Sequence, residues 1–308
     1  MIYTLTLNPA LDRELTVSNL VFDEVLRATA LRIDYGGKGL NVSRALAALG
    51  ADSKALGFVG GKTGEKLEAG LASLGIETDF TWLGEETRTN VSVVSDHEPH
   101  YLKVNESGPM VTSAEQAALM EKVEDLRRPG DWWVLAGSLP PGAAETIYAD
   151  VIERLQSVGA NAILDTSGPP LRHGCESGPF LVKPNADEAR ELTGVRVDTV
   201  GAARAAAESI HSLGVELVLI SMGKAGALLS DGDTIWMARP PEVAERNPIG
   251  AGDASVAGLV WGLSQELPLP DVLRWSMASG AAAASLDGTA VGSYELVESL
   301  VEQVSIAG

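Results

Sequence analysis

The sequence has 308 residues, of which 45% are hydrophobic and 21% are charged, as in an ordinary globular protein. Its formal net charge of −19 argues against binding to nucleic acids or anionic membrane surfaces, because both require basic patches. Cys175 is the only cysteine, which excludes a disulfide framework and any metal site built from several cysteines. The length allows one large domain or two medium ones.

The N-terminal stretch MIYTLTLNPALDRE has neither a basic region nor a cleavage site, so it predicts a first strand and not a signal peptide. No apolar stretch reaches the roughly 18 uncharged residues that a membrane span needs. We therefore expect a cytoplasmic protein.

Short β-branched segments alternate with amphipathic segments along most of the chain. The expected strands are 2–7, 53–59, 132–136, 160–164, 180–183, 217–221, 225–230 and 234–238. The expected helices are 40–49, 62–74, 113–126, 142–157, 199–213, 252–264, 269–285 and 293–304. This alternation predicts an α/β protein with a mostly parallel sheet that is covered by helices on both faces.

Residues 13–34 and 87–104 break this rhythm, because polar and apolar residues alternate there without an intervening helix. The pattern is typical of antiparallel strands. We predict that the two regions pair as a small sheet projecting from a single domain that spans residues 1–308. This sheet could be a lid over a site, a dimer surface, or both.

Several common catalytic motifs are absent from the sequence. GFVGGKT at 57–63 is one spacer short of a P-loop, and no intact GxGxxG follows the first strand. There is no HExxH zinc motif and no GxSxG elbow, and the four histidines are scattered. These absences direct attention to the glycine-rich loops.

YGGKGLNVSRALAALG at 35–50 places glycines before a predicted helix. Free backbone N–H groups at a helix N-terminus suit anions and hydroxyl groups. A tight turn would also need glycine, but Lys38 and Asn41 beside the bare backbone are better explained as ligand groups.

NPIGAGDASVAGLVWGL at 247–263 repeats this construction, with Gly250, Ala251 and Gly252 leading into Asp253. Asp253 could act as a helix N-cap, which contributes roughly 0.5–2 kcal/mol. A cap, however, does not require the glycines before it. Two such loops in one chain indicate two ligands, or the two ends of one reaction.

KPNADEARELTG at 183–194 follows a strand and places Asn185 and Glu188 at a helix start. Their oxygens suit Mg²⁺, which keeps several waters and takes one or two protein groups. Acidic residues that favour a helix N-terminus explain the segment equally well. Gly57, Ser138, Lys183 and Ser221 lie at or just after the ends of predicted strands, so we expect them to meet at one edge of the sheet in a single site.

These segments resemble the ribokinase-like sugar kinases, from residue 2 to about residue 290. The most specific are GAGDASVAG at 250–258 and GGKGLNVSRALAALG at 36–50. Other strings resemble the branch that phosphorylates sugar monophosphates, which includes kinases of fructose 1-phosphate, tagatose 6-phosphate and fructose 6-phosphate. They are NPALD (8–12), TRTNV (87–91), KVNESGP (103–109), GSLPPG (137–142), DTSG (165–168) and KPNADE (183–188).

The resemblance implies a three-layer α/β/α fold with a small β-sheet lid, the substrates ATP and a sugar phosphate, Mg²⁺, and a homodimer formed through the lid. It implies that Asp253 is the general base and that the backbone of Gly250, Ala251, Gly252 and Asp253 forms an anion hole. The implied acceptor contacts are Asp12, Gly37, Lys38, Asn41, Arg88, Ser138, Arg27 and Lys103. The implied nucleotide contacts are Lys183, Asn185, Ser221, Gly223 and Gly226, with Glu188 and Asn185 holding Mg²⁺ through water.

The sequence departs from the family pattern at two places. The family commonly has serine directly after the catalytic aspartate, whereas this chain has Ala254 and then Ser255. The lid string DEVLRAT at 23–29 leaves Arg27 as its only cation.

The expected activity is ATP-dependent phosphorylation of a ketohexose monophosphate, with fructose 1-phosphate converted to fructose 1,6-bisphosphate. Tagatose 6-phosphate and fructose 6-phosphate remain open as acceptors. An unphosphorylated acceptor is disfavoured, because it would not need Lys38 and Arg88. A non-catalytic protein that binds sugar phosphates is disfavoured by the intact Asp253 and the glycines before it.

Overall fold

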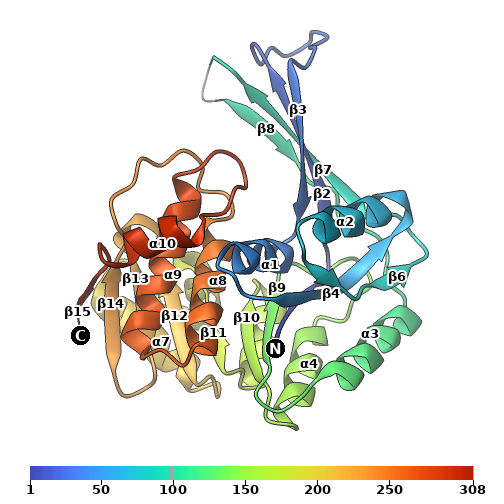
Figure 1. Cartoon of the computed structure of the whole chain (residues 1–308). Helices are drawn as coiled ribbons and strands as arrows, with labels where there is room; N and C mark the ends of the chain where they lie inside the picture. The colour runs from blue at the N-terminus through green and yellow to red at the C-terminus, as the bar shows by residue number, and fades with distance from the viewer. Residues whose placement is uncertain (98–99, 308) are drawn as a thin grey trace.

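The computed structural model describes residues 1–97 and 100–307. Strands and helices alternate along most of the chain (Figure 1). The strands are β1 (Ile2–Thr6), β2 (Ala10–Val17), β3 (Ala30–Gly36), β4 (Ser53–Gly60), β5 (Glu77–Thr78), β6 (Thr81–Leu83), β7 (Arg88–Ser95), β8 (Tyr101–Val104), β9 (Trp132–Ala136), β10 (Asn161–Asp165), β11 (Leu181–Val182), β12 (Leu217–Ser221), β13 (Ala227–Ser230), β14 (Ile235–Arg239) and β15 (Ser305–Ala307). The helices are α1 (Lys38–Ala48), α2 (Gly61–Ser73), α3 (Ser113–Leu126), α4 (Ile147–Gln156), α5 (Pro169–Glu176), α6 (Ala186–Thr193), α7 (Val200–His211), α8 (Ala251–Ser264), α9 (Leu269–Ala284) and α10 (Tyr294–Val301).

The main sheet has the strand order β15-β14-β13-β12-β11-β10-β9-β1-β4-β5, with β6 paired to β4. Neighbours from β12 through to β5 are parallel, whereas β12 to β15 pair antiparallel. Central strands such as β9, with the sequence WWVLA, are apolar throughout because both of their faces are buried. The predicted mostly parallel sheet is therefore confirmed.

Helices cover both faces of the main sheet, so that helices, sheet and helices form three layers (Figure 1). One hydrophobic core joins the strands to α3, α4, α5, α6 and α7. A second core joins the opposite face to α1, α8, α9 and α10, and α2 packs beside α1. Within the described residues, no helix is long and apolar enough to cross a membrane.

A separate sheet with the order β3-β2-β7-β8 extends away from the main sheet, as Figure 1 shows. The small sheet predicted from 13–34 and 87–104 is therefore confirmed, and we call it the lid sheet. Its expected antiparallel pairing is wrong for one pair, because β2 and β7 are parallel. Both strands run outward from the main sheet, and the long segment between them supplies the crossover that parallel pairing needs. Positions 98 and 99 of the predicted range lie outside the described residues.

The remaining differences from the predicted elements are local. The helix expected from residue 142 begins at Ile147, because Gly142 adopts a positive φ of 81° and residues 141–142 and 145–146 form turns. Helix α5 was not predicted, although proline stands in its first turn, a position that tolerates proline. Strands β5, β6 and β15 are two or three residues long, too short for a period-two pattern to mark them.

Candidate active site

Polar groups from several loops meet at the carboxyl edge of the parallel strands. Asp165 ends β10, and its Oδ1 accepts a hydrogen bond from Lys38 Nζ at 3.1 Å. Lys183 follows β11, and its Nζ lies 3.6 Å from the same oxygen. Asn185 forms a β-bridge with Ser221, the last residue of β12. The structure therefore brings together Lys183, Asn185 and Ser221, as their places after predicted strands indicate, and Lys38 joins them.

Asp253 lies in the first turn of α8, but it is not the helix N-cap. Gly250 is the N-cap, and it adopts a left-handed backbone with φ of 84° that favours glycine. The side chain of Asp253 makes no capping hydrogen bond. Its Oδ2 instead accepts from Asn41 Nδ2 at 2.8 Å, and the residue is 9% exposed. The bond joins the two glycine-rich loops through their polar residues.

Burial, followed by the nearby negative charge of Asp165, raises the pKa of Asp253 to about 6. The hydrogen bond from Asn41 and the positive charges of Lys38 and Lys183 oppose this rise. The result is a carboxylate that is ionised at neutral pH but is a much stronger base than an exposed aspartate.

Asp165 is the site residue that the sequence reasoning missed. It is 2% exposed and lies between two ammonium groups. Burial alone would raise the pKa of Asp165, but Lys183 and Lys38 hold it below its usual range. Its signal in the sequence is the string DTSG at 165–168, which resembles a family motif but does not by itself indicate a role for the aspartate.

The N-terminus of α8 leaves backbone donors free beside these charges. Ala251 N–H donates to Pro248 O at 3.2 Å, whereas Gly252 and Asp253 N–H have no acceptor among residues 1–97 and 100–307. Gly252 also faces Lys183, since a Cβ at residue 252 would lie 3.9 Å from Lys183 Nζ. The free N–H groups suit an anion, although Ala251 contributes less than the sequence suggested.

The unusual Ala254 has a packing explanation. It is 3% exposed and belongs to the core beneath α8. The hydroxyl group of Ser255 hydrogen-bonds to Ser276 Oγ at 2.8 Å. The hydroxyl group displaced by one residue therefore joins α8 to α9.

Two of the predicted acceptor contacts, Asp12 and Arg88, lie at the base of the lid sheet. Asp12 Oδ1 accepts from Asn90 Nδ2 at 2.7 Å, and burial raises the pKa of Asp12. The guanidinium group of Arg88 donates to three backbone carbonyls, those of Asn8, Pro9 and Glu106. These bonds use three of its five N–H groups, so a phosphate could take up to two more. Gly37, with φ of 134°, packs against Thr6 and turns the chain into α1.

A cavity of about 500 Å³ is lined by three of the predicted nucleotide contacts, Asn185, Ser221 and Gly223, among others. Gly223 begins the short 3₁₀ turn that joins β12 to β13. Gly226 follows this turn, where its φ of 104° and its close approach to Ala238 O leave no room for a side chain. Gly226 thus shapes the turn and does not line the cavity.

Asn185 and Glu188 form a capping box at the start of α6. Asn185 Oδ1 accepts from the N–H groups of Asp187 and Glu188, and Glu188 Oε2 accepts from Asn185 N–H at 2.8 Å. The helix-capping explanation is therefore correct for both side chains. Within the described residues, groups of three or more His, Cys, Asp and Glu side chains suited to hold a metal are absent.

Of the four other predicted residues, Gly57 and Arg27 are not gathered with these groups, whereas Ser138 follows Gly137, whose N–H donates to Asp165 O at 3.0 Å. Gly57 packs against β1, where a Cβ would overlap Thr6 O. Ser138 is exposed and has no side-chain hydrogen bond within the described chain. Lys103 is exposed on β8, within electrostatic range of Asp12. Arg27 belongs to the loop between β2 and β3, at the far end of the lid sheet (Figure 1).

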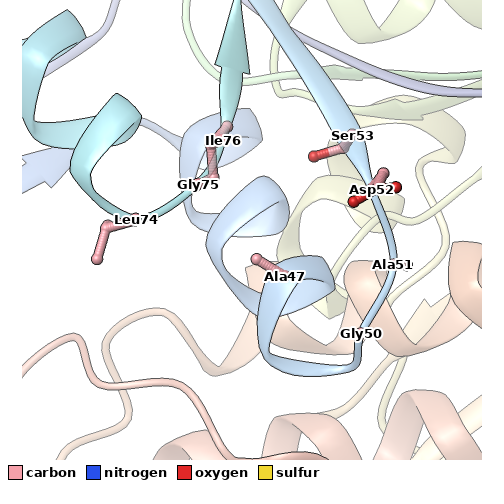
Figure 2. Close-up of a pocket in the computed structure, with 8 residues that line it drawn as sticks. All are labelled: Ala47, Gly50, Ala51, Asp52, Ser53, Leu74, Gly75 and Ile76. Atoms are coloured by element: carbon pink, nitrogen blue, oxygen red, sulfur yellow. The ribbon is translucent and has the colours of Figure 1, made fainter.

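A second cavity, of about 240 Å³, lies at the C-terminal end of α1, away from Lys38 at its N-terminal end (Figure 2). It is bordered by Ala47, Asp52 and Leu74, where α1 and α2 end and β4 begins. None of the predicted site residues lines it. The candidate site is therefore the carboxyl edge of the main sheet.

Comparisons with known proteins identify the family of the chain. The chain matches the pfkB family of carbohydrate kinases over residues 6–295. It is 36% identical over 306 residues to a 1-phosphofructokinase of Bacillus subtilis strain 168, with 99% of each chain covered. It is 33% identical over 285 residues to a 1-phosphofructokinase of Borreliella burgdorferi, with 92% of each chain covered. Its fold matches phosphofructokinase-2 from Escherichia coli in complex with potassium, with a TM-score of 0.93, 31% identity and 98% of each chain covered.

The main sheet with helices on both faces, the separate smaller sheet and the similarity to solved phosphofructokinase structures define a ribokinase-like kinase. The chain belongs to the pfkB family of carbohydrate kinases. It is a phosphotransferase of the sugar-phosphate kinase type, and the family implies ATP as its phosphoryl donor. The resemblance read from the sequence is thereby confirmed.

Replacing Asp253 with Asn is expected to stabilise the folded protein at pH 8 by about 3 kcal/mol, because folding raises the pKa from 3.8 to about 6 and one pKa unit corresponds to about 1.4 kcal/mol. An aspartate whose pKa is raised by folding destabilises the fold where it is ionised, here above about pH 6. This destabilisation fades as the pH falls through that value, so the gain should be smaller at pH 4.5. Urea unfolding of Asp253→Asn at both pH values measures it.

The exposed aspartate of the β13–β14 turn provides the control, because Asp233→Asn should leave the free energy of unfolding nearly unchanged at both pH values. Equal gains for Asp253→Asn at pH 8 and pH 4.5 would show that burial does not penalise its charge.

Proposed function

We propose that this protein transfers the γ-phosphoryl group of ATP to fructose 1-phosphate, forming fructose 1,6-bisphosphate. The relatives named 1-phosphofructokinase, which are similar over nearly the whole chain, support this acceptor. The observation that carries the chemistry is the buried Asp253, held at the N-terminus of α8 and flanked by Lys38 and Lys183.

Asp253 is proposed as the general base. Its Oδ2 is held by Asn41, and its Oδ1 has no partner within residues 1–97 and 100–307, so that oxygen is free to accept a proton. The proton passes from the acceptor hydroxyl group to Asp253 as the hydroxyl oxygen attacks the γ-phosphorus. The bond from that phosphorus to the β–γ bridging oxygen then breaks, and ADP leaves. A base with a pKa near 6 is suited to this step at neutral pH.

The free N–H groups of Gly252 and Asp253, with Gly250 shaping the loop, are proposed to stabilise the transferring phosphoryl group. Lys183, whose ammonium group lies beside Gly252, adds positive charge on the donor side. Asn185, Ser221 and Gly223 would contact the nucleotide at the cavity that they line.

The acceptor is proposed to lie between α1 and the base of the lid sheet. Asp12 and Asn41, with the backbone around Gly37, suit sugar hydroxyl groups. Lys38 and the two remaining N–H groups of Arg88 suit the acceptor's existing phosphate. Ser138 and Lys103 are exposed nearby contributors in this proposal, and Arg27 would reach an active site only in a second subunit.

The residues present fit Mg²⁺ through Glu188 alone. The capping box uses Oε2 of Glu188 and the side-chain oxygen of Asn185, but Glu188 Oε1 has no partner within the described residues. One carboxylate oxygen acting through water matches the few protein ligands that Mg²⁺ takes beside phosphates. When bound, the ion would neutralise charge on the nucleotide phosphates.

A second acceptor is supported by a specific observation. Phosphofructokinase-2 from Escherichia coli in complex with fructose-6-phosphate matches the fold with a TM-score of 0.91 and 31% identity over 98% of this chain. The acceptor therefore needs a direct test.

The panel for that test is fructose 1-phosphate, fructose 6-phosphate, tagatose 6-phosphate and fructose, with ATP and Mg²⁺ and with ADP release as the readout. We expect fructose 1-phosphate to give the highest kcat/KM, and free fructose at least about a hundredfold less, because it cannot pair with Lys38. Highest kcat/KM for another phosphosugar would reassign the acceptor. Turnover of none would contradict the proposed function.

Replacing Asp253 with Asn should lower kcat by about 10²–10⁴-fold while ATP binding changes little. For the wild type, kcat/KM should fall as the pH drops through about 6, because protonated Asp253 cannot act as a base. The pH of this fall, which we call the acid limb of kcat/KM, depends on the charged groups around the carboxylate, which are Lys38, Lys183 and Asp165. If kcat/KM of the wild type fell only below pH 5, or if the Asp253→Asn variant remained active, Asp253 would not be the general base.

We also propose that the lid sheet pairs two copies of the chain. We base this proposal on the large apolar side chains that the lid sheet and its β2–β3 loop expose, because large exposed apolar patches are rare on monomeric proteins. Leu31, Tyr101, Leu102 and Val104 lie on its strands, and Val21, Phe22 and Val25 lie on the loop between β2 and β3. The Escherichia coli neighbour has a structure described as the tetrameric inhibited form, so assembly of related chains beyond a dimer is known.

The double variant Phe22→Asp/Tyr101→Asp should sediment as a monomer, whereas the wild type should sediment as a dimer or a larger assembly. Leu74→Asp, which introduces a charge at an exposed apolar residue after α2, is the control and should sediment like the wild type. A wild-type monomer, or an unchanged assembly of the double variant, would refute pairing through the lid sheet.

A further inference from the structure

One buried carboxylate connects the acceptor and donor halves of the site. Oδ1 of Asp165 lies 3.1 Å from Lys38 Nζ and 3.6 Å from Lys183 Nζ. Lys38 begins α1 beside the acceptor loop, and Lys183 precedes the segment that lines the donor cavity. A single oxygen thus fixes two ammonium groups that approach from different parts of the chain.

The backbone around Asp165 is held as firmly as its side chain. Its carbonyl accepts from Gly137 N–H at 3.0 Å, and Lys183 N–H donates to the preceding carbonyl, that of Leu164, also at 3.0 Å. Gly137 O in turn accepts from Tyr148 Oη and Thr166 Oγ1, both in the buried layer below. Asp165 is therefore a rigid anchor for flexible lysine side chains.

We propose that Asp165 is a positioning residue that holds Lys38 on the acceptor side and Lys183 on the donor side, away from the carboxylate of Asp253. The proposal rests on the proposed function, because it assigns the two lysines to the two substrates. Asp165 itself contacts neither reacting atom.

The charge balance of the site explains why this position needs an anion. Two ammonium groups and two carboxylates share a largely buried region, where unpaired charge is costly. Without the charge of Asp165, Asp253 would be the carboxylate that interacts electrostatically with both lysines. An ion pair with either lysine would lower the basicity of Asp253 and would remove that lysine from its phosphate.

Asp165 is poorly suited to two other roles. Two ammonium groups already approach one of its oxygens, so a divalent cation there would be repelled. A merely structural ion pair has a different setting, as at Asp131, which pairs with the N-terminus of the chain before β9 begins. Asp131 is also buried, at 6% exposed, and lies away from the site residues.

The test is Asp165→Asn, which keeps the shape and removes the charge. KM for the sugar phosphate and KM for ATP should both rise about fivefold or more, because both lysines lose their anchor. The acid limb of kcat/KM should move to lower pH by about half a unit or more, since the lysines then approach Asp253. Thermal unfolding followed by circular dichroism establishes that the variant is folded.

Asp131→Asn is the matched control for loss of a buried carboxylate. It should lower thermal stability while leaving both KM values and the acid limb unchanged. If Asp165→Asn also changed only stability, or raised only one of the two KM values, the proposal would be wrong. Recovery of Asp165→Asn activity by excess Mg²⁺ would likewise overturn it in favour of a metal role.

If Asp165→Asn does not fold, Lys183→Met tests the same charged groups, and the acid limb of kcat/KM is then expected to shift in the opposite direction. Removal of this ammonium group takes away a positive charge that stabilises ionised Asp253, so the acid limb should move to higher pH. A limb that stayed in place would refute the coupling. Failure of the proposed function appears separately, as absence of wild-type turnover in the acceptor panel.

Discussion

The site depends on the burial of Asp253 at the start of α8. A carboxylate that is 9% exposed would ordinarily be unfavourable, but here a helix N-terminus, an amide and two ammonium groups surround it. Asp165 then prevents these cations from neutralising it completely. The arrangement keeps the carboxylate charged at neutral pH and leaves one of its oxygens free, which is what a proton acceptor requires.

The main sheet explains why these groups meet although they are far apart in the sequence. Parallel strands bring their carboxyl ends to one edge, so residues at 165, 183 and 221 become neighbours without any local sequence relationship. The two glycine-rich loops open α1 and α8, which pack against the same face of that sheet. The Asn41–Asp253 hydrogen bond, between residues 212 apart in the sequence, is a direct result of this packing.

Much of this was accessible from the sequence because it depends on local patterns. The alternation of strands and helices gave the layers, and the glycine-rich loops located Lys38 and Asp253. Asp165 was missed because its role comes from two lysines at distant positions, which no spacing rule reveals. The parallel pairing of β2 with β7 was missed for the same reason, since an alternating pattern specifies the faces of a strand but not the direction of its neighbour. At α6, the pattern allowed both a cap and a metal site, and only the hydrogen bonds identify the cap.

The lid sheet is connected to the site both along the chain and through side-chain contacts. Strand β3 ends at Gly36, which packs against Asp12, and the next two residues are Gly37 and Lys38. Farther out on β3, the guanidinium group of Arg32 packs against Gly288, in the loop after α9. Arg44 on α1 donates to the neighbouring Thr289 and to Asn41, the residue that holds Asp253. A displacement of the lid sheet would therefore shift Lys38 and disturb the hydrogen bonds around Asp253 together, so the proposed pairing surface and the proposed base are connected by one set of contacts.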